Sequence, residues 1–142
     1  MKDRSLQDEL SLLMMRIALR GKYGLLEVAD KHGITMMQAL TVCLLDPDQV
    51  TPMSSISNYL RCDPSNVTGN VDRLVNAGFI ERKECERDRR VKDLTMTKKG
   101  LALRQTLLRV ATEKRMPNLQ DLSVSEVEEL MRLLDKATDT AI

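Results

Sequence analysis

Two short helices followed by a hairpin are predicted over residues 52–100, and this order restricts the possible folds more than any other feature of the chain. Thr51-Pro52 and Asp63-Pro64 each place a side-chain oxygen before a proline. This pair favours a helix start, because the oxygen accepts hydrogen bonds from free amides and proline has no amide to satisfy. We therefore expect helices over 52–60 and 64–76, joined by a tight turn.

Two short alternating segments follow the second of these helices. Gly78 is placed to end that helix in a left-handed conformation. Residues 79–83 and 92–96 then alternate between apolar and polar side chains and predict the two strands of a hairpin, with 84–91 as its turn. The order helix, turn, helix, hairpin is that of a winged helix-turn-helix. The predicted fold class is mainly α, with one small β-hairpin (α+β).

The N-terminal third of the chain is predicted to be helical. Its first segment repeats apolar residues at a spacing of three and four, which is typical of an amphipathic helix: Leu6, Leu10, Leu13, Met14 and Ile17. Two alternatives stay open, because this helix either breaks at Gly21 or continues to His32-Gly33. Thr35 is placed to cap a second helix that runs through Leu45.

The C-terminal third is also predicted to be helical. Thr97 is placed to cap a helix that Pro117 closes. Ser123 and Glu126 have the spacing of a capping box, which marks the start of the last helix. The apolar stripe of that helix consists of Val127, Leu130, Leu133, Leu134 and Ala137.

Length and composition indicate one globular domain over residues 1–142. Hydrophobic residues make up 42% of the chain and charged residues 30%, as in ordinary globular proteins. No apolar run approaches the roughly 20 residues that a membrane span needs, and the N-terminus does not resemble a signal peptide. The three cysteines fit neither a disulfide framework nor a zinc motif. We therefore expect a cytoplasmic protein without membrane contact.

The predicted helix over 64–76 has one apolar and one polar face. Val67, Val71 and Leu74 share the side that would pack on the core. The opposite side carries Ser65, Asn66, Gly69, Arg73 and Asn76, with Thr68 and Asn70 on its flanks. Gly69 costs about 1 kcal/mol of helix propensity. A glycine here suits a helix whose backbone a partner approaches closely.

Basic residues gather in the predicted hairpin, although the net charge of the chain is only +1. Between residues 82 and 92, the acids Glu84, Glu86 and Asp88 are outnumbered by Arg82, Lys83, Arg87, Arg89, Arg90 and Lys92. A basic hairpin tip alone is more often a solvated loop than a binding site. Directly after a polar-faced helix, it favours an interface for nucleic acid.

The stretch 63–100 resembles the MarR (multiple antibiotic resistance regulator) family of bacterial transcription regulators. The residues that carry the resemblance are Ser65, Thr68, Val71, Leu74 and Gly78 in and after the helix, Asp88-Arg89-Arg90 in the hairpin, and Leu94-Thr95 with Thr97 before Gly100. The sequence departs from the family pattern in one place, because Gly100 lies one or two residues further on than usual. The family also implies a third short strand, which would come from around Val50-Thr51.

The resemblance implies a symmetric homodimer. Residues 34–100 would form the winged helix-turn-helix core, and residues 1–31 and 101–142 the dimerisation helices. The partner would be double-stranded DNA with a pseudo-palindromic operator, and the function would be transcriptional regulation. Regulators of this family are most often repressors that a small ligand or another signal relieves. The resemblance implies no cofactor.

The same resemblance suggests roles for individual residues. Asn66 and Asn70 have the amide geometry to read adenine, and Ser65 and Thr68 can bind a base edge or a phosphate. Arg89 or Arg90 would enter the adjacent minor groove. Asp88 would orient Arg90 or Arg73 as an ion pair, although Arg73 equally suits a role in the fold alone. Lys83, Arg87 and Lys92 would bind phosphates.

Other readings of these features stay open. A winged helix can also serve as a protein-interaction module or an architectural DNA-binding module. An enzyme is not favoured, because His32 is the only histidine and no acid–base pair accompanies it. Cys85 is a candidate redox sensor, because we expect it to be the most exposed cysteine. Met14-Met15 and Met36-Met37 are interpreted as core filler, or as the lining of a ligand pocket.

Overall fold

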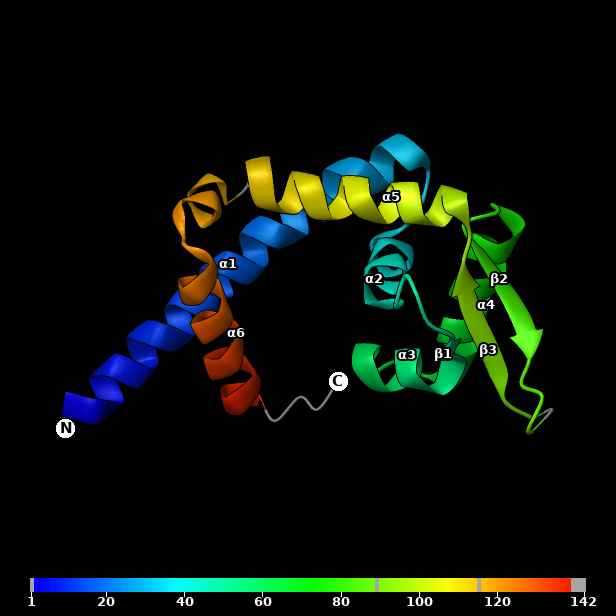
Figure 1. Cartoon of the computed structure of the whole chain (residues 1–142), viewed down its shortest axis with the longest axis horizontal. Helices are drawn as coiled ribbons and strands as arrows, with labels where there is room; N and C mark the ends of the chain where they lie inside the picture. The colour runs from blue at the N-terminus through cyan, green and yellow to red at the C-terminus, as the bar shows by residue number, and fades with distance from the viewer. Residues whose placement is uncertain (1, 89, 115, 139–142) are drawn as a thin grey trace.

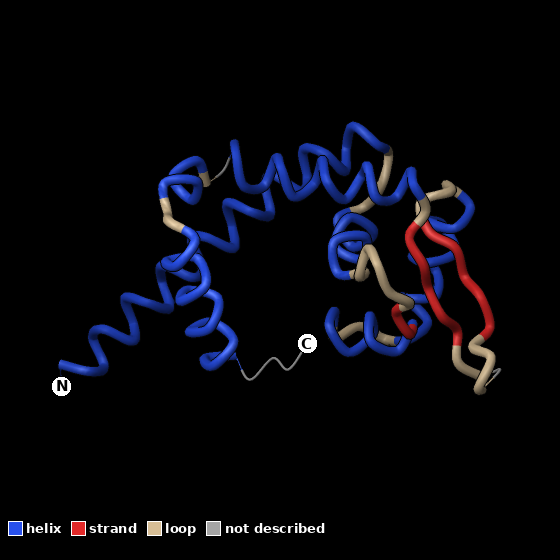
Figure 2. Tube along the Cα trace, in the orientation of Figure 1, coloured by secondary structure: helices blue, strands red, loops and turns tan. Residues whose placement is uncertain are grey.

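The computed structural model describes residues 2–88, 90–114 and 116–138, and it is a winged helix flanked by long helices (Figure 1). The predicted fold class is confirmed. Figure 2 shows that the strands form a single small sheet. The helices are α1 (Lys2–His32), α2 (Met36–Leu44), α3 (Met53–Leu60), α4 (Pro64–Asn76), α5 (Lys98–Arg109) and α6 (Val124–Thr138). The strands are β1 (Thr51–Pro52), β2 (Ile80–Glu84) and β3 (Lys92–Met96).

Three predicted helix starts are confirmed by their hydrogen bonds. The side chain of Thr35 accepts from the amide of Gln38, whose own side chain accepts from the amide of Thr35. Thr97 Oγ1 accepts from the amide of Gly100 at 3.0 Å. Ser123 and Glu126 form the predicted capping box, with the Ser123 amide 2.8 Å from Glu126 Oε2. Each of these caps depends only on residues three positions apart.

Helix α1 does not break at Gly21. It continues to His32, so the second of the two alternatives is correct. Helix α5 ends at Arg109 and continues as a π-helical turn over Val110–Lys114, and Pro117 then begins a short 3-10 helix, Pro117–Asp121. The expectation that Pro117 closes the helix therefore places its end too late.

An ion pair joins the π-helical turn to α1. Glu27 Oε1 lies 3.0 Å from the ammonium nitrogen of Lys114 and 3.1 Å from that of Lys31. The hydrogen bonds from Lys114 and Lys31 lower the pKa of the Glu27 carboxyl to about 2. The carboxylate is therefore ionised at physiological pH, and it links the π-helical turn to α1.

The capping prediction was wrong at Thr51 and at Asp63. Neither residue provides a side-chain cap to the helix that follows. Thr51 lies instead in a strand, and its hydroxyl accepts from the amide of Asp46 at 3.4 Å. The extended backbone at this point pairs with β3, a contact distant in sequence that local capping rules do not include. At Asp63 the main-chain carbonyl, not the side chain, accepts from the amides of Asn66 and Val67.

The sheet is antiparallel with the order β1-β3-β2. Thr51 pairs with Leu94, which confirms the third strand expected around Val50-Thr51. Arg82 also pairs with Leu94, from the other side of β3. Because side chains alternate between the two faces of a strand, Arg82 lies on the same face as the buried Ile80 and Leu94. Lys83 lies on the opposite face.

The core lies where α4, α2, α5 and the sheet meet. Val67, Val71 and Leu74 of α4 are buried, as the helical spacing predicted. Leu94 of β3 and Leu107 of α5 belong to the same cluster. The position of α4 is therefore set by its apolar face, and its polar face is left toward solvent.

A tight corner connects the end of α4 to the start of α5. Gly78 has a φ of 76°, the left-handed conformation predicted for it. Thr97 Oγ1 donates to the carbonyl groups of Gly78 and Phe79, at 2.7 and 3.0 Å. Lys99 Nζ donates to the carbonyl of Ala77 at 2.7 Å and lies 4.6 Å from the centre of the Phe79 ring. The orientation of α4 is thus tied to that of α5.

Large apolar side chains are exposed along α1 and α6. Figure 1 shows the N-terminal half of α1 and α6 at one end of the molecule and the sheet at the other. Met14 is 37% exposed and Met15 is 55% exposed, so the interpretation of this pair as core filler was wrong for the single chain. No described residue of α6 is buried. Among the described residues, no helix is both long and apolar enough to cross a membrane.

Candidate nucleic-acid interface

The polar face of α4 is open to solvent. Ser65, Asn66, Gly69, Arg73 and Asn76 are exposed, whereas Thr68 and Asn70 are half-buried on its two flanks. Thr68 Oγ1 donates to the carbonyl of Pro64 at 2.8 Å, which leaves this hydroxyl free only as an acceptor. The face therefore presents amides, a guanidinium and an uncovered stretch of backbone at Gly69.

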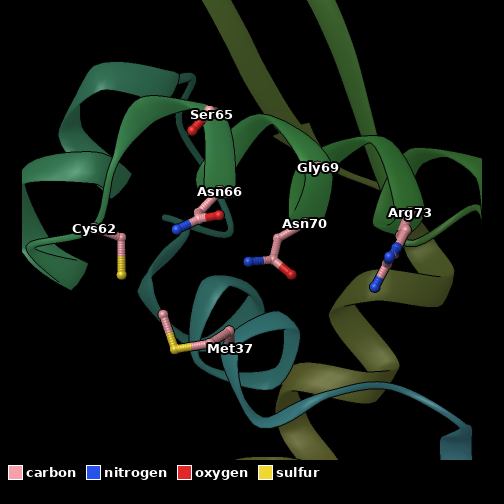
Figure 3. A pocket seen from close by; sticks show the side chains of 7 residues that line it. All are labelled: Met37, Cys62, Ser65, Asn66, Gly69, Asn70 and Arg73. Carbon is pink, nitrogen blue, oxygen red and sulfur yellow. The ribbon is translucent and has the colours of Figure 1, made fainter.

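One side of this face borders a crevice of about 350 Å³ between α4 and α2. Figure 3 shows the Asn66, Asn70 and Arg73 side chains directed toward it, with Met37 of α2 on its far side and Cys62, just before α4, at one end. Within the described part of the chain, these two amides and this guanidinium have no hydrogen-bond or ion-pair partner. Polar groups of this kind are available for an external ligand.

The other side of α4 is joined to the wing. Asp72 Oδ1 lies 2.5 Å from Arg82 Nη1 of β2. Arg73 was expected either to contact DNA or to pair with a carboxylate of the wing. The ion pair between helix and wing is instead made by its neighbour, Asp72. Helical spacing puts Asp72 on the flank of α4, and strand alternation puts Arg82 on the inner face of β2. These two positions were the only sequence signal for the ion pair, and it was not predicted.

The bases of the wing differ in how they are paired. Lys92 Nζ lies 2.7 Å from Glu84 Oε1, and this hydrogen bond lowers the pKa of the Glu84 carboxyl. Lys83 Nζ lies 3.7 Å from Glu81 Oε2, on the sheet face that points away from α4. Arg87 and Arg90 are exposed, and no described carboxylate lies within ion-pair distance of either. The available charge of the wing is thus concentrated at its tip. Arg89 lies outside the described residues.

The expectation of an ion pair at Asp88 was wrong for the described residues. Its carboxylate accepts from the backbone amide of Arg90 at 2.9 Å, and its carbonyl accepts from the amide of Val91 at 2.9 Å. A short carboxylate readily reaches the backbone two residues ahead, which forms an Asx turn. Asp88 therefore shapes the tip of the wing and does not orient the guanidinium of Arg73 or Arg90.

The three cysteines lie in different environments. Burial raises the pKa of the Cys43 thiol to about 11, which keeps it protonated and unreactive. Cys62 lines the crevice beside α4. Cys85 is only half-buried, and redox sensing at this residue stays a prediction. In the part of the chain that the structure describes, no group of three or more His, Cys, Asp or Glu residues could hold a metal ion.

Comparison with known proteins shows a match to one family over part of the chain. Residues 34–92 match the model of the MarR family. The fold is similar to that of YusO from Bacillus subtilis, with a TM-score of 0.60 and 25% identity over 97% of this chain and 98% of that one. It is also similar to a MepR mutant from S. aureus, with a TM-score of 0.78 and 21% identity over 94% and 97% of the two chains.

A further similar structure contains DNA. It is a MarR mutant from E. coli complexed with operator DNA, with a TM-score of 0.62 and 24% identity over 92% of this chain and 94% of that one. At this level of identity the likeness shows the winged-helix fold alone.

Proposed function

We propose that this chain, whose residues 34–92 match the model of the MarR family, is a dimeric regulator of transcription that binds double-stranded DNA at specific sequences. The observation that carries the proposal is the exposed face of α4. It presents Asn66, Asn70 and Arg73 without partners in the described chain, beside a wing tip with Arg87 and Arg90 equally unpaired. Unpaired donors and cations on one surface suit a polyanion with base edges to read.

The two parts of this surface have different tasks. Helix α4 enters the major groove, where Asn66 and Asn70 suit adenine and Arg73 suits guanine. Gly69 allows the helix backbone to approach the DNA closely. Arg90 and its neighbours at the wing tip enter the adjacent minor groove or bind its phosphates. Lys83 and Lys92 were expected to bind phosphates. They are already paired with Glu81 and Glu84, so they contribute less to phosphate binding.

The proposal includes a homodimer. The apolar side chains exposed on α6, such as Leu130 at 40% and Leu133 at 46%, have no cover in the single chain. A second copy would cover them together with the exposed leucines of α1. Two copies related by a twofold axis place their α4 helices on one side of a duplex, so the operator should be a pseudo-palindrome with half-sites about one helical turn apart.

Repression relieved by a small ligand is the proposed mode of regulation. The crevice between α2 and α4 supports it, because a ligand there would compete with DNA for Asn66, Asn70 and Arg73. Selection from a pool of random duplexes with the purified protein tests the proposal. Enrichment of one pseudo-palindromic sequence is the expected result. Binding without any enriched sequence would favour the architectural alternative, and no binding would favour a protein-interaction module.

A further inference from the structure

Helix α1 and the extension of α5 leave the hydrophobic core at the same level of the molecule, where they are in contact (Figure 1). In α1, no described residue before Gly24 is buried, whereas Val28 belongs to the core cluster. Beyond α5, Val110 belongs to that cluster, and no described residue after it is buried. We call residues 6–23 and 116–138, which lie beyond this level, the arms. The arms are therefore attached to the winged helix through this one junction.

The π-helical turn Val110–Lys114 lies at this junction. Hydrogen bonds in a π-helical turn span five residues where those of an α-helix span four, and such turns are common where helices bend. The hydroxyl of Thr112 donates to the carbonyl groups of Leu108 and Arg109, at 2.9 and 3.2 Å. A threonine that bonds the preceding turn in this way favours bending further. The C-terminal arm is therefore joined to the core by a segment that bends more easily than an α-helix.

One ion pair crosses the junction from the core side of α1 to the end of the π-helical turn. Glu27 follows Gly24 by one turn of α1, and its carboxylate accepts a hydrogen bond from Lys114 Nζ at 3.0 Å. The same carboxylate accepts from Lys31 Nζ at 3.1 Å, but that bond stays within α1. The hydrogen bond from Lys114 is the main reason why the pKa of the Glu27 carboxyl falls to about 2. The link to Lys114 thus restrains the segment that bends most easily.

The junction lies between the surfaces that would form the dimer and the helix that would read DNA. In a dimer joined through the arms, a bend at the junction of each copy changes the separation of the two α4 helices. The duplex demands a fixed separation, because one base pair more or less between the half-sites moves them by about 3.4 Å and also rotates one relative to the other. Whatever restrains the junction therefore selects the operator spacing.

We propose that Glu27 and Lys114 are positioning residues, whose ion pair fixes the angle between arms and winged helix and so sets the half-site spacing that the dimer accepts. The inference rests on the proposed function, because it needs a dimer that binds two half-sites. It adds a contribution to specificity from residues that lie in the junction and outside α4 and the wing.

The test compares full-length Lys114→Met with Lys31→Met. Each variant removes one positive charge and one hydrogen bond from the same carboxylate, but only the first removes the link between the helices. Affinities are measured for the selected duplex, for versions with one base pair added or removed between the half-sites, and for a single half-site. The wild type should lose affinity when the spacing changes. In Lys114→Met this loss should be about fivefold smaller, the largest factor expected from an exposed ion pair.

Lys31→Met and the conservative variant Lys114→Arg should keep the spacing dependence of the wild type, and all variants should bind the single half-site alike. An unchanged spacing dependence in Lys114→Met would overturn the inference. Equal changes in Lys31→Met would do the same, because they would show an effect of charge alone, and so would weaker half-site binding by Lys114→Met, which would place the effect in the winged helix.

Hydrogen exchange of the backbone amides of residues 110–114 tests the junction without DNA. Exchange should be faster in Lys114→Met than in Lys31→Met, because the first variant lacks the bond that restrains this turn. If the wild type prefers no DNA sequence, the proposed regulator fails, and this comparison then decides whether the ion pair restrains the junction. Equal exchange in the two variants would overturn the inference whatever the protein binds.

Discussion

Asp72 of α4 accepts a hydrogen bond from the guanidinium of Arg82 in β2, with 2.5 Å between Oδ1 and Nη1. It is the only hydrogen bond between the side chains of α4 and the hairpin strands among the described residues. Both side chains are more than a third exposed, so the pair adds little to stability. Its consequence is geometric, because it fixes the wing relative to the helix that is proposed to read DNA.

Asp72→Asn should therefore weaken DNA binding although it removes a negative charge from the DNA-facing side. We expect a loss of about fivefold, or roughly 1 kcal/mol, with little change in thermal unfolding. The control is Glu81→Gln, which removes the same charge from the outer face of the sheet. Fluorescence anisotropy with the selected duplex measures both. Equal or tighter binding by Asp72→Asn would show that the loss of the negative charge matters more for DNA binding than the position of the wing relative to α4.

Arg90→Ala should lower the salt dependence of DNA binding more than Lys83→Ala. Loss of one phosphate contact reduces the slope of log affinity against log salt by about one. Arg90 is unpaired in the described chain at the wing tip, whereas Lys83 is paired with Glu81 on the outer face of the sheet. Affinities across a salt series give both slopes. Equal changes in slope would contradict the different roles of these two bases.

Gly69→Ala should stabilise the protein and weaken its DNA binding. A Cβ at this position would have no atom within 4 Å apart from its chain neighbours and the nearby backbone of its own helix, and alanine is better than glycine in a helix by about 1 kcal/mol. The added methyl group would project from the exposed face of α4 toward the DNA. Gly21→Ala, also in a helix without close neighbours, is the control and should gain stability alone. Unchanged DNA affinity in Gly69→Ala would remove this residue from the interface.

Gly100→Ala should destabilise the fold. Its Cβ would lie 1.9 Å from the carbonyl oxygen of Phe79 and 2.9 Å from the carbonyl carbon, both backbone atoms in the corner between α4 and α5. Such overpacking should cost roughly 2 kcal/mol or more. Urea unfolding measures the change. A free energy of unfolding equal to that of the wild type would mean that the backbone of this corner can move to accept the methyl group. The corner would then not fix the orientation of α4 relative to α5.

Leu133→Glu should convert the proposed dimer to a monomer without unfolding the chain. Leu133 is 46% exposed on α6, and no described residue of that helix is buried. A charge there is solvated in the monomer but would be buried without a partner in a dimer. Sedimentation velocity and circular dichroism distinguish the two effects. A wild-type protein that sediments as a monomer, or a variant that remains a dimer, would contradict the assigned interface.

The sequence predicted most accurately the features that depend on near neighbours. The caps at Thr35, Thr97 and Ser123 and the left-handed Gly78 follow from local backbone geometry, and the structure contains all four. The buried face of α4 followed from helical spacing alone. The motif around the hairpin indicated the family whose model matches residues 34–92, because it combines several residues at fixed separations.

Local sequence rules missed the features that require distant partners, and the strand at Thr51 was expected only from the family resemblance. Thr51 pairs with Leu94, so it forms a strand where local rules predict a helix cap. The hydrogen bond from Arg82 to Asp72 depends on how the wing docks against α4. No local pattern marks these contacts, because each joins residues that are near in space only after the sheet has packed on the helices.

The most direct test of the central claim is the affinity of the purified protein for the DNA upstream of its own coding region, compared with a random duplex across a salt series. Binding that is tight, prefers the upstream duplex and weakens steeply with salt is the predicted result, because base contacts give the preference and phosphate contacts give the slope. Absence of binding to either duplex at low salt would contradict the account.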